Sequence, residues 1–467
     1  MKLRRVFGDY AILLAGTIAG RLVALLSGTL LARHLGAEGL GKFGTGITLI
    51  GYLLLVSNLG LDSIGTRLVA GKASRAWPVA ARVRVVRLTV AALLGALALI
   101  VVKWTNGPLA FALPLPFLGA TLAFRDDWLL LALGRSRAVA TASFVREAVY
   151  LVLIALIVTR SPSPVMAAWV YLGADAVWAI AIQIMLRGRD SRANNEPSPR
   201  IGSLVRSGVP IAVMGLMTLT YTKIDTPLLA AMKGAREAGV YFAAYGIVFA
   251  VQAVLTPLTR AAIPEMAKVE AGGANASLAG MFRLSRLATS FSGLLAAGIL
   301  VGADSILGLL YGEGYARGAV PLRLLAWSIP FTASYCILQQ RLIIQDRHQR
   351  FALLGGMAAV TNVCLNVCLI PAYGIGGAAV ATIASELVLF LGTTSLYGTH
   401  PQAKRLAFRL AMVLLALSGL GVTLNLLEMN PALLRAVIAL ICFGVIALVG
   451  YAFEKRMEHN HIWDWGS

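Results

Sequence analysis

Charged and amide side chains stand inside long apolar segments of this sequence or at their ends. Ten of them are candidates for function: Arg21, Arg125, Asp126, Asp127, Asp175, Asp225, Gln339, Gln340, Arg341 and Glu386. An ionisable group in hydrocarbon costs several kcal/mol and persists only beside a partner or in a watery cavity. An arginine in such a place can hold an anion, because it stays charged and donates in a planar fork. These residues are therefore the candidates for binding chemistry.

Arg21 is the leading candidate, because it lies midway along the first apolar segment and far from water at either end. It binds an anionic substrate or forms a structural ion pair, with Asp175 as the partner. Arg125, Asp126 and Asp127 line a polar cavity or mark the cytoplasmic end of the fourth segment.

The carboxylates Asp175 and Glu386 fall at equivalent places in the sixth and twelfth segments. They bind coupling protons or cations, or they pair with arginines. Asp225 is a third carboxylate of this kind, near the outer end of the seventh segment. Gln339, Gln340 and Arg341 come late in the tenth segment, where they bind ligand hydroxyls or form a polar end of the span.

The composition identifies the elements that must position these side chains as membrane helices. The chain has 467 residues, of which 58% are hydrophobic and only 13% are charged, and its mean hydropathy is +0.78. A soluble protein carries about 25% charged residues. Fourteen apolar stretches are each long enough to cross a bilayer. We expect spans at 10–32, 43–61, 85–103, 109–133, 142–159, 165–186, 205–224, 238–259, 285–310, 321–345, 351–371, 375–397, 406–427 and 431–452.

The net charge of +20 is spread over the connections between spans, with lysine and arginine concentrated in every second connection. This positive-inside bias places both termini in the cytoplasm. Because the basic residues form no compact stripe with aromatics, a nucleic-acid partner is not expected. The basic segment 67–87 is either an amphipathic stretch on anionic lipid or a cytoplasmic loop.

A short motif occurs twice in the same orientation. Residues 36–43 (GAEGLGKF) and 234–241 (GAREAGVY) share identical or similar residues at four positions. About six spans separate the copies, which indicates two parallel six-helix bundles. We expect one bundle at 1–190, a cytoplasmic linker at 191–204, a second bundle at 205–400, and two further helices with a tail at 401–467.

Several segments resemble bacterial polysaccharide repeat-unit flippases of the multidrug/oligosaccharidyl-lipid/polysaccharide exporter superfamily. They are 32–43 (ARHLGAEGLGKF), 60–70 (GLDSIGTRLVA), 221–225 (YTKID), 239–245 (GVYFAAY) and 371–379 (PAYGIGGAA). The family often has a basic residue after the last tyrosine of the fourth segment, where this chain has Gly246.

The resemblance implies an all-α polytopic protein with two six-helix bundles in a V and two C-terminal helices. It implies alternating-access flipping of an undecaprenyl-diphosphate-linked oligosaccharide, for O-antigen or exopolysaccharide synthesis, across the bacterial inner membrane. A polysaccharide polymerase and a chain-length regulator are the implied protein partners. In this interpretation Arg21 holds the diphosphate, while Gln339 and Gln340 meet sugar hydroxyls. A lipid II flippase, an ion-coupled multidrug exporter and a non-transporting scaffold for glycan assembly are the alternatives.

Conventional enzyme chemistry is not expected from this sequence, because no nucleophile and base stand in a catalytic arrangement. No cofactor is expected. Residues 39–44 (GLGKFG) resemble a dinucleotide-binding pattern, but a membrane span follows them and no strand precedes them. Cys364 and Cys368 share a helix face without a His or carboxylate partner, and so no metal site is expected.

Overall fold

The computed structural model describes residues 2–70, 73–104, 117, 121–187, 199–252, 274–345, 347–397 and 400–426. Every regular element in these ranges is helical. The chain groups into two compact units, Met1–Gly239 and Val240–Ser467, which are called here unit 1 and unit 2. Three parts of the expected arrangement lie outside the described residues. They are residues 191–198 of the expected linker at 191–204, the last span at 431–452, and most of 109–120.

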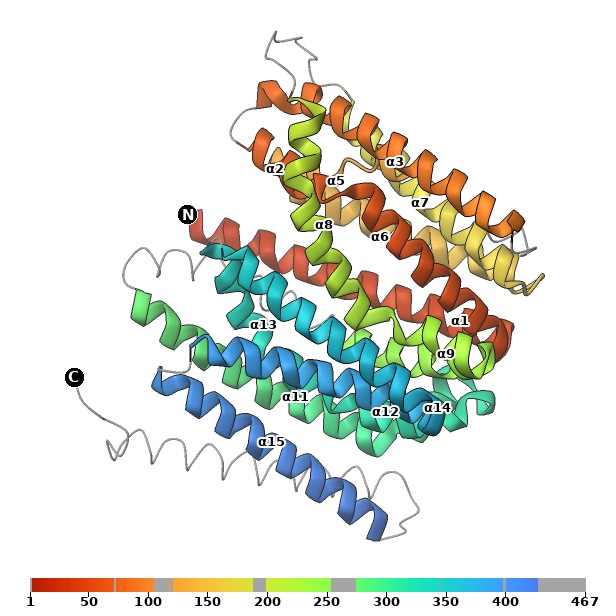
Figure 1. Ribbon diagram of the computed structural model, residues 1–467, viewed down its shortest axis with the longest axis vertical. Coiled ribbons are helices and arrows are strands. Elements are labelled where there is room, and N and C mark those ends of the chain that lie inside the picture. The colour runs from red at the N-terminus through yellow and green to blue at the C-terminus, as the bar shows by residue number, and fades with distance from the viewer. Residues whose placement is uncertain are drawn as a thin grey trace. The chain divides into compact units, whose positions relative to one another are not determined.

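Unit 1 is built on the long helix α1, which packs against α6 and α7, while α6 and α7 pack against each other (Figure 1). Its elements are α1 (Lys2–Asn58), α2 (Leu61–Val69), the 3₁₀ turn η1 (Ala73–Arg75), α3 (Ala76–Trp104), α5 (Asp127–Ala132), α6 (Ser136–Leu153), the π-helical turn η3 (Ile154–Val158), α7 (Pro164–Leu186), α8 (Ile201–Lys223) and α9 (Asp225–Lys233).

Unit 2 is arranged around α11, which packs against both α13 and α15, while α13 packs against α14 (Figure 1). Its elements after the helical segment at 240–252 are α11 (Ala274–Tyr311), η4 (Glu313–Gly318), α12 (Ala319–Ala326), α13 (Ser328–Ile344), α14 (His348–Ser395) and α15 (Pro401–Leu426).

Six helical stretches among the described residues are long and apolar enough to cross a membrane. Two of them, Ala19–Val69 and Gln349–Ser395, have 51 and 47 residues, or about 70–77 Å at 1.5 Å per residue. That is more than twice the roughly 30 Å of a hydrocarbon core. Helices α1 and α14, which make up most of these stretches, each contain one glycine outside helical geometry, Gly36 and Gly374. The first stretch also has Gly60, with φ 68°, between α1 and α2. The polytopic all-α prediction is confirmed, whereas the number fourteen stays a prediction.

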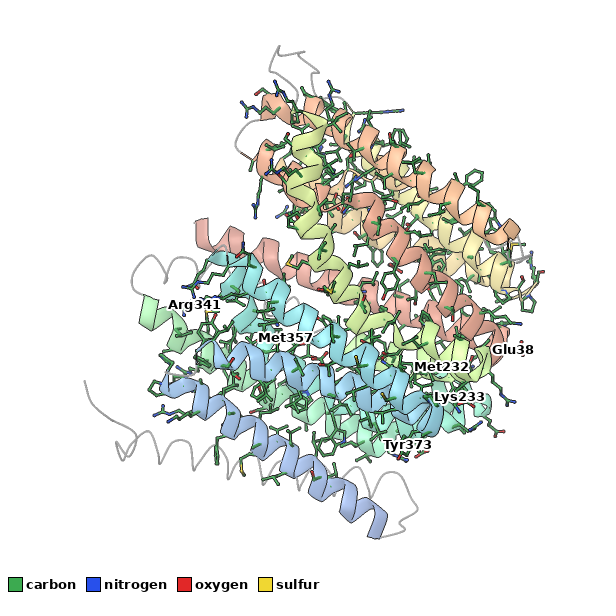
Figure 2. All side chains as sticks on the ribbon, viewed as in Figure 1. Glu38, Met232, Lys233, Arg341, Met357 and Tyr373 are labelled. Carbon is green, nitrogen blue, oxygen red and sulfur yellow. The ribbon has the colours of Figure 1, made fainter. Side chains whose placement is uncertain are left out.

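The two bends have the same cause. Gly36 has φ 65° and Gly374 has φ 54°, a left-handed region that costs a residue with a Cβ about 1–2 kcal/mol. The expected turn at 371–374 is thus present. In unit 2, Figure 2 shows Tyr373 and Arg341 at opposite ends.

The structure corrects the interpretation of 67–87 as one loop. The helix α3 begins at Ala76, about nine residues before the expected span, so Arg84 and Arg87 lie inside a helix. Apolar residues at 79, 80, 83 and 86 are buried on one face of α3. Because their spacing of three to four residues gives these turns an apolar face to pack, they are helical as well. Arg87 lies close to that face and is fully buried.

The core of unit 1 forms where α2, α3, α5, α7 and α8 meet. Its largest buried side chain is Trp128 of α5, which packs with Leu61, Ile182 and Leu204. A Cβ at Gly65 would lie 2.6 Å from the Trp128 ring. The indole therefore needs the bare backbone of α2, which fixes α5 beside it.

The first copy of the repeated motif and residues 234–239 of the second lie in unit 1, where they pack on each other reciprocally. A Cβ on Gly41 would lie 1.7 Å from the carbonyl oxygen of Ala235, and a Cβ on Gly239 would lie 1.7 Å from that of Ala37. Figure 2 shows Glu38 and Lys233 at the same end of the unit. Each copy begins with a glycine of positive φ, Gly36 or Gly234. The sequence repeat is thus a structural repeat, and its small residues permit the close approach of two backbones.

Replacing Gly41 by alanine is expected to destabilise the protein by roughly 1–3 kcal/mol, because two helices must separate to admit the methyl group. The matched control is Gly46→Ala in the same helix, where nothing lies within 4 Å of the added carbon; it should be neutral or stabilise by up to about 1 kcal/mol. Thermal unfolding of the purified protein in detergent measures both. Equal midpoints for the two variants would refute the close contact.

Candidate functional site

Four arginines of unit 1 face four carboxylates in what we call the arginine–carboxylate network. Its members are Arg84, Arg87, Arg125 and Arg146 with Asp62, Asp126, Glu147 and Asp175. They come from α2, α3, α6, α7 and the non-helical break at 125–126 between two helices.

Arg87 is the most enclosed member. Its Nη2 donates to Asp62 Oδ1 and, at 2.7 Å, to Asn58 Oδ1, which also accepts from Nε at 3.1 Å. Its Nη1 reaches the carbonyl oxygens of Leu122 and Arg125 at 3.4 and 3.3 Å. The amide of Asn58 completes the set by donating to Asp62 at 2.9 Å. The donors of this guanidinium thus join α3 to α1 and α2 through Nε and Nη2, and to the chain before α5 through Nη1.

Arg84 binds two side chains that also bind each other, Asp126 and Gln183. Its guanidinium donates to Asp126 Oδ2 and, at 3.0 Å, to the Gln183 side-chain oxygen. The Gln183 amide nitrogen donates to Asp126 at 3.0 Å and to the Phe124 carbonyl at 2.6 Å. Asp126 is fully buried, so α3 and α7 together hold this carboxylate at the break in the chain.

Asp175 of α7 is shared by two arginines. Arg146 Nε donates to its Oδ1 at 2.6 Å, and Arg125 Nη1 to its Oδ2 at 3.4 Å. The Arg125 guanidinium also lies 3.8 Å from the Trp178 ring, within range of a cation–π contact. Arg146 also binds Glu147 at 2.5 Å. Asp175 therefore forms ion pairs with Arg146 and Arg125, and its role in coupling stays a prediction.

The network therefore balances four positive charges with four negative ones. Arg84 and Arg125 keep 21% of their side chains exposed, whereas Arg146 keeps 10% and Arg87 only 1%. A neutral set of buried pairs holds helices in place more readily than it attracts an anion. Asp127, the first residue of α5, lies within electrostatic range of Arg125 and Arg87. For Arg125, Asp126 and Asp127 the substrate-binding role thus stays a prediction.

Arg21, Lys223 and Asp225 form a separate charged group, called here the Arg21 group. Arg21 of α1 is exposed, Lys223 is half-buried at the end of α8, and Asp225 begins α9 and is 2% exposed. The charges of both Arg21 and Asp225 act on the lysine amine. Lys223 thus lies within electrostatic range of one cation, Arg21, and of one buried carboxylate, Asp225.

Glu386 of α14 occupies a different setting in unit 2. Its Oε2 accepts from Tyr335 Oη at 2.6 Å and Thr332 Oγ1 at 2.8 Å, both on α13. The same threonine accepts from the Gln252 amide at 3.0 Å. Glu386 is 6% exposed, and no arginine or lysine is within salt-bridge distance of it among the described residues. Its role in coupling stays a prediction.

The amides predicted to bind hydroxyls separate on α13. Gln339 is buried and donates to Thr393 Oγ1 of α14 at 3.3 Å, whereas Gln340 is half-buried. Arg341 is 5% exposed and lies 5.9 Å from the Tyr397 ring. Gln339 therefore joins α13 to α14, and Arg341 contacts the chain that follows α14.

Arg84, Arg87 and Arg146 are not among the ten candidates of the sequence analysis. A signal was present for two of them, because Arg84 and Arg87 are three residues apart and therefore share one helix face. The partners Asn58 and Asp62 lie on either side of the turn at Leu59 and Gly60, which spacing does not reveal.

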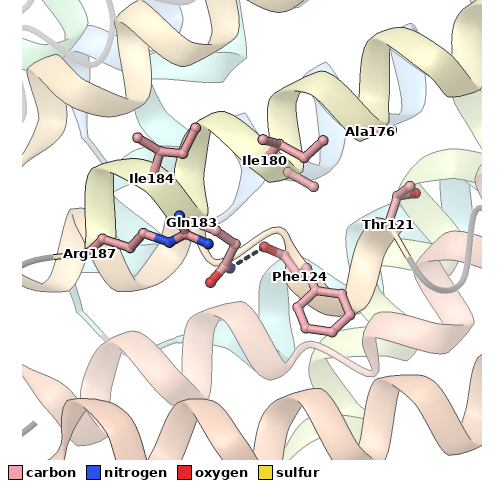
Figure 3. Close-up of a pocket in the computed structure, with 8 residues that line it drawn as sticks. Thr121, Phe124, Ala176, Ile180, Gln183, Ile184 and Arg187 are labelled. Atoms are coloured by element: carbon pink, nitrogen blue, oxygen red, sulfur yellow. Dashed lines mark hydrogen bonds between the residues drawn. The ribbon is translucent and has the colours of Figure 1, made fainter.

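A groove of about 370 Å³ opens beside the network (Figure 3). It runs between Phe124 and one stripe of α7 that includes Gln183, and Figure 3 shows the hydrogen bond between these two residues.

Replacing Arg146 by methionine is expected to destabilise the protein by roughly 3–5 kcal/mol, because Asp175 loses its nearer partner while buried. The double variant Arg146→Met/Asp175→Leu should recover most of this loss, since it removes both charges. Arg160→Met, at an exposed arginine, is the matched control. The thermal unfolding midpoints of the three variants in detergent measure these effects. A double variant less stable than Arg146→Met would contradict a structural ion pair between Arg146 and Asp175.

The fold has relatives among solved structures of transporters. "Lipid II flippase MurJ, inward closed conformation" matches with a TM-score of 0.75 and 11% identity, covering 96% of this chain and 99% of that one. An inward-facing multidrug resistance MATE family transporter matches at 0.67 and 16%, covering 84% and 99%. A MOP superfamily transporter from Pyrococcus furiosus matches at 0.56 and 15%, covering 86% and 96%. At these identities the likeness shows the fold alone.

No curated protein matches this sequence significantly. A family model described as "Polysaccharide biosynthesis protein" matches residues 7–270, more than half of the chain. The predicted resemblance is confirmed, and the chain belongs to the polysaccharide biosynthesis protein family.

Proposed function

We propose that this protein flips an undecaprenyl-diphosphate-linked oligosaccharide repeat unit across the bacterial inner membrane by alternating access. The family of the chain concerns polysaccharide biosynthesis, and one solved structure with this fold is named a lipid II flippase. A lipid-linked sugar is the substrate class that joins these two facts. The polymerase and chain-length regulator remain proposed partners, and cytoplasmic termini remain the proposed orientation.

The observation that carries the proposal is the Arg21 group. The fold brings Arg21 and Lys223 near each other from two membrane-spanning helices, although like charges repel strongly in apolar surroundings. A diphosphate with more than one negative charge relieves that repulsion by binding both cations. The planar donor fork of Arg21 suits its oxygens, and Arg21 is exposed to an incoming ligand.

The charge of Arg21 also bears on the two alternative functions, a multidrug exporter and a lipid II flippase. A multidrug exporter for cationic drugs needs an acidic or aromatic cavity, whereas Arg21 is an exposed cation that repels them. A lipid II flippase shares the fold and the need for a cation at the diphosphate. The sugar part of the substrate separates these two, and a comparison of substrates is therefore part of the test.

We predict that Arg21→Ala lowers flipping at least tenfold, since a charge-assisted hydrogen bond is worth about 1.5–3 kcal/mol. Arg21→Lys should restore part of the rate, because it keeps the charge and loses the fork. The measurement is appearance of a labelled lipid-diphosphate oligosaccharide at the far leaflet of vesicles holding purified protein. Arg160→Ala, at an exposed arginine outside the group, should flip at the wild-type rate.

Normal flipping by a well-folded Arg21→Ala protein would remove the central role of this arginine. Faster flipping of lipid II than of a repeat-unit lipid by the wild-type protein would instead favour the peptidoglycan alternative. Wild-type vesicles that flip neither lipid would support the scaffold alternative.

A further inference from the structure

The groove of unit 1 has the shape and charge pattern of a lipid site. We propose that it binds one acyl chain of an anionic membrane glycerophospholipid, with the phosphate held by Arg187. This phospholipid is distinct from the transported substrate, and its site does not depend on the proposed function.

The floor of the groove is one stripe of α7. Ala176, Ala179, Ile180, Ile184 and Arg187 recur at intervals of three and four residues, which places them on one helix face. Ile180 and Ile184 are each 58% exposed, an exposure that suits a membrane surface and no aqueous one. The small side chains at 176 and 179 leave the depression in which a chain can lie.

The length of this stripe matches one leaflet of a bilayer. From Ala176 to Arg187 the helix rises by about 16 Å at 1.5 Å per residue, and one leaflet contributes about 15 Å of the roughly 30 Å hydrocarbon core. An acyl chain seated here therefore ends near the bilayer midplane, with its headgroup at the end of α7. An undecaprenyl chain is several times longer than the groove, which favours the phospholipid.

The headgroup end is cationic. Arg187 is exposed at the C-terminus of α7, and Figure 3 shows its side chain extending toward Gln183. Arg135 reaches the same helix end, where its Nη1 donates to the Met185 carbonyl at 2.5 Å. Arg84 stands beside the groove, 5.7 Å from the Phe124 ring. An anionic phosphate complements these charges, whereas a zwitterionic headgroup brings its own cation.

The groove is also tied to the arginine–carboxylate network. Gln183 lines the groove and binds Asp126 and Arg84 of the network. Its second contact, to the Phe124 carbonyl, fixes the opposite wall. A chain packed between Phe124 and α7 therefore also holds the break at 125–126 in place, so bound lipid should stabilise the protein.

The test is native mass spectrometry of the full-length protein in detergent after incubation with phosphatidylglycerol, phosphatidylcholine or undecaprenyl diphosphate. We expect one retained phosphatidylglycerol per protein and a higher thermal midpoint with it. Arg187→Gln should lower retention about tenfold through the lost charge-assisted contact, and Ala176→Leu should lower it by filling the floor. Arg82→Gln, at an exposed arginine of α3 outside the groove, should retain the lipid like the wild type.

Circular dichroism and size exclusion establish that each variant is folded, and Arg187→Gln changes only an exposed helix end. Equal retention by all four proteins would overturn the proposal. Equal retention of phosphatidylcholine would overturn the anionic headgroup, and displacement of phosphatidylglycerol by undecaprenyl diphosphate would show that the groove serves the substrate instead.

Discussion

A charge in a membrane-spanning helix must be neutralised or hydrated, and this condition governs the arrangement of unit 1. Breaking a buried pair by removing one partner costs about 3–5 kcal/mol, and the network contains four such arginines. Arg87 alone joins α1, α2 and α3 and also binds the chain between α3 and α5. The positions of these helices therefore follow from where the carboxylates stand, as well as from the packing of apolar side chains.

This condition separates the charges of unit 1 into two kinds. In the network, each guanidinium meets a carboxylate, and the total is neutral. In the Arg21 group, Arg21 and Asp225 both act on the Lys223 amine, and Arg21 is exposed. The paired charges of the network suit holding helices in place, whereas an exposed arginine beside a lysine suits the proposed binding of an anion.

Much of the fold was predictable, because membrane helices follow from composition and the repeat marks its own turns. The copies at 36–43 and 234–241 are similar in sequence, and the structure shows positive φ at the start of each. The reciprocal contact of Gly41 with Gly239 needed coordinates, since sequence spacing does not say which helices touch.

The charged residues were harder to place. Counting arginines between apolar stretches treats each as a loop residue, yet Arg84, Arg87 and Arg146 lie within helices. In the first turns of α3 arginines alternate with apolar residues, which lowers the mean hydropathy there, and the start of α3 was therefore placed too late. Asp175 was expected to pair with an arginine or bind a coupling ion. Which arginine it meets depends on helix rotation, which composition does not encode.

A double-mutant cycle on binding tests most directly whether Arg21 and Lys223 hold one diphosphate. The affinity of the purified protein for undecaprenyl diphosphate would be measured for wild type, Arg21→Ala, Lys223→Ala and the double variant. If both residues hold one diphosphate, each single variant should weaken binding about tenfold or more. The double variant should then lose clearly less affinity than the product of the two single losses. Affinities that are unchanged in all variants, or losses that multiply independently, would contradict a shared diphosphate site at Arg21 and Lys223.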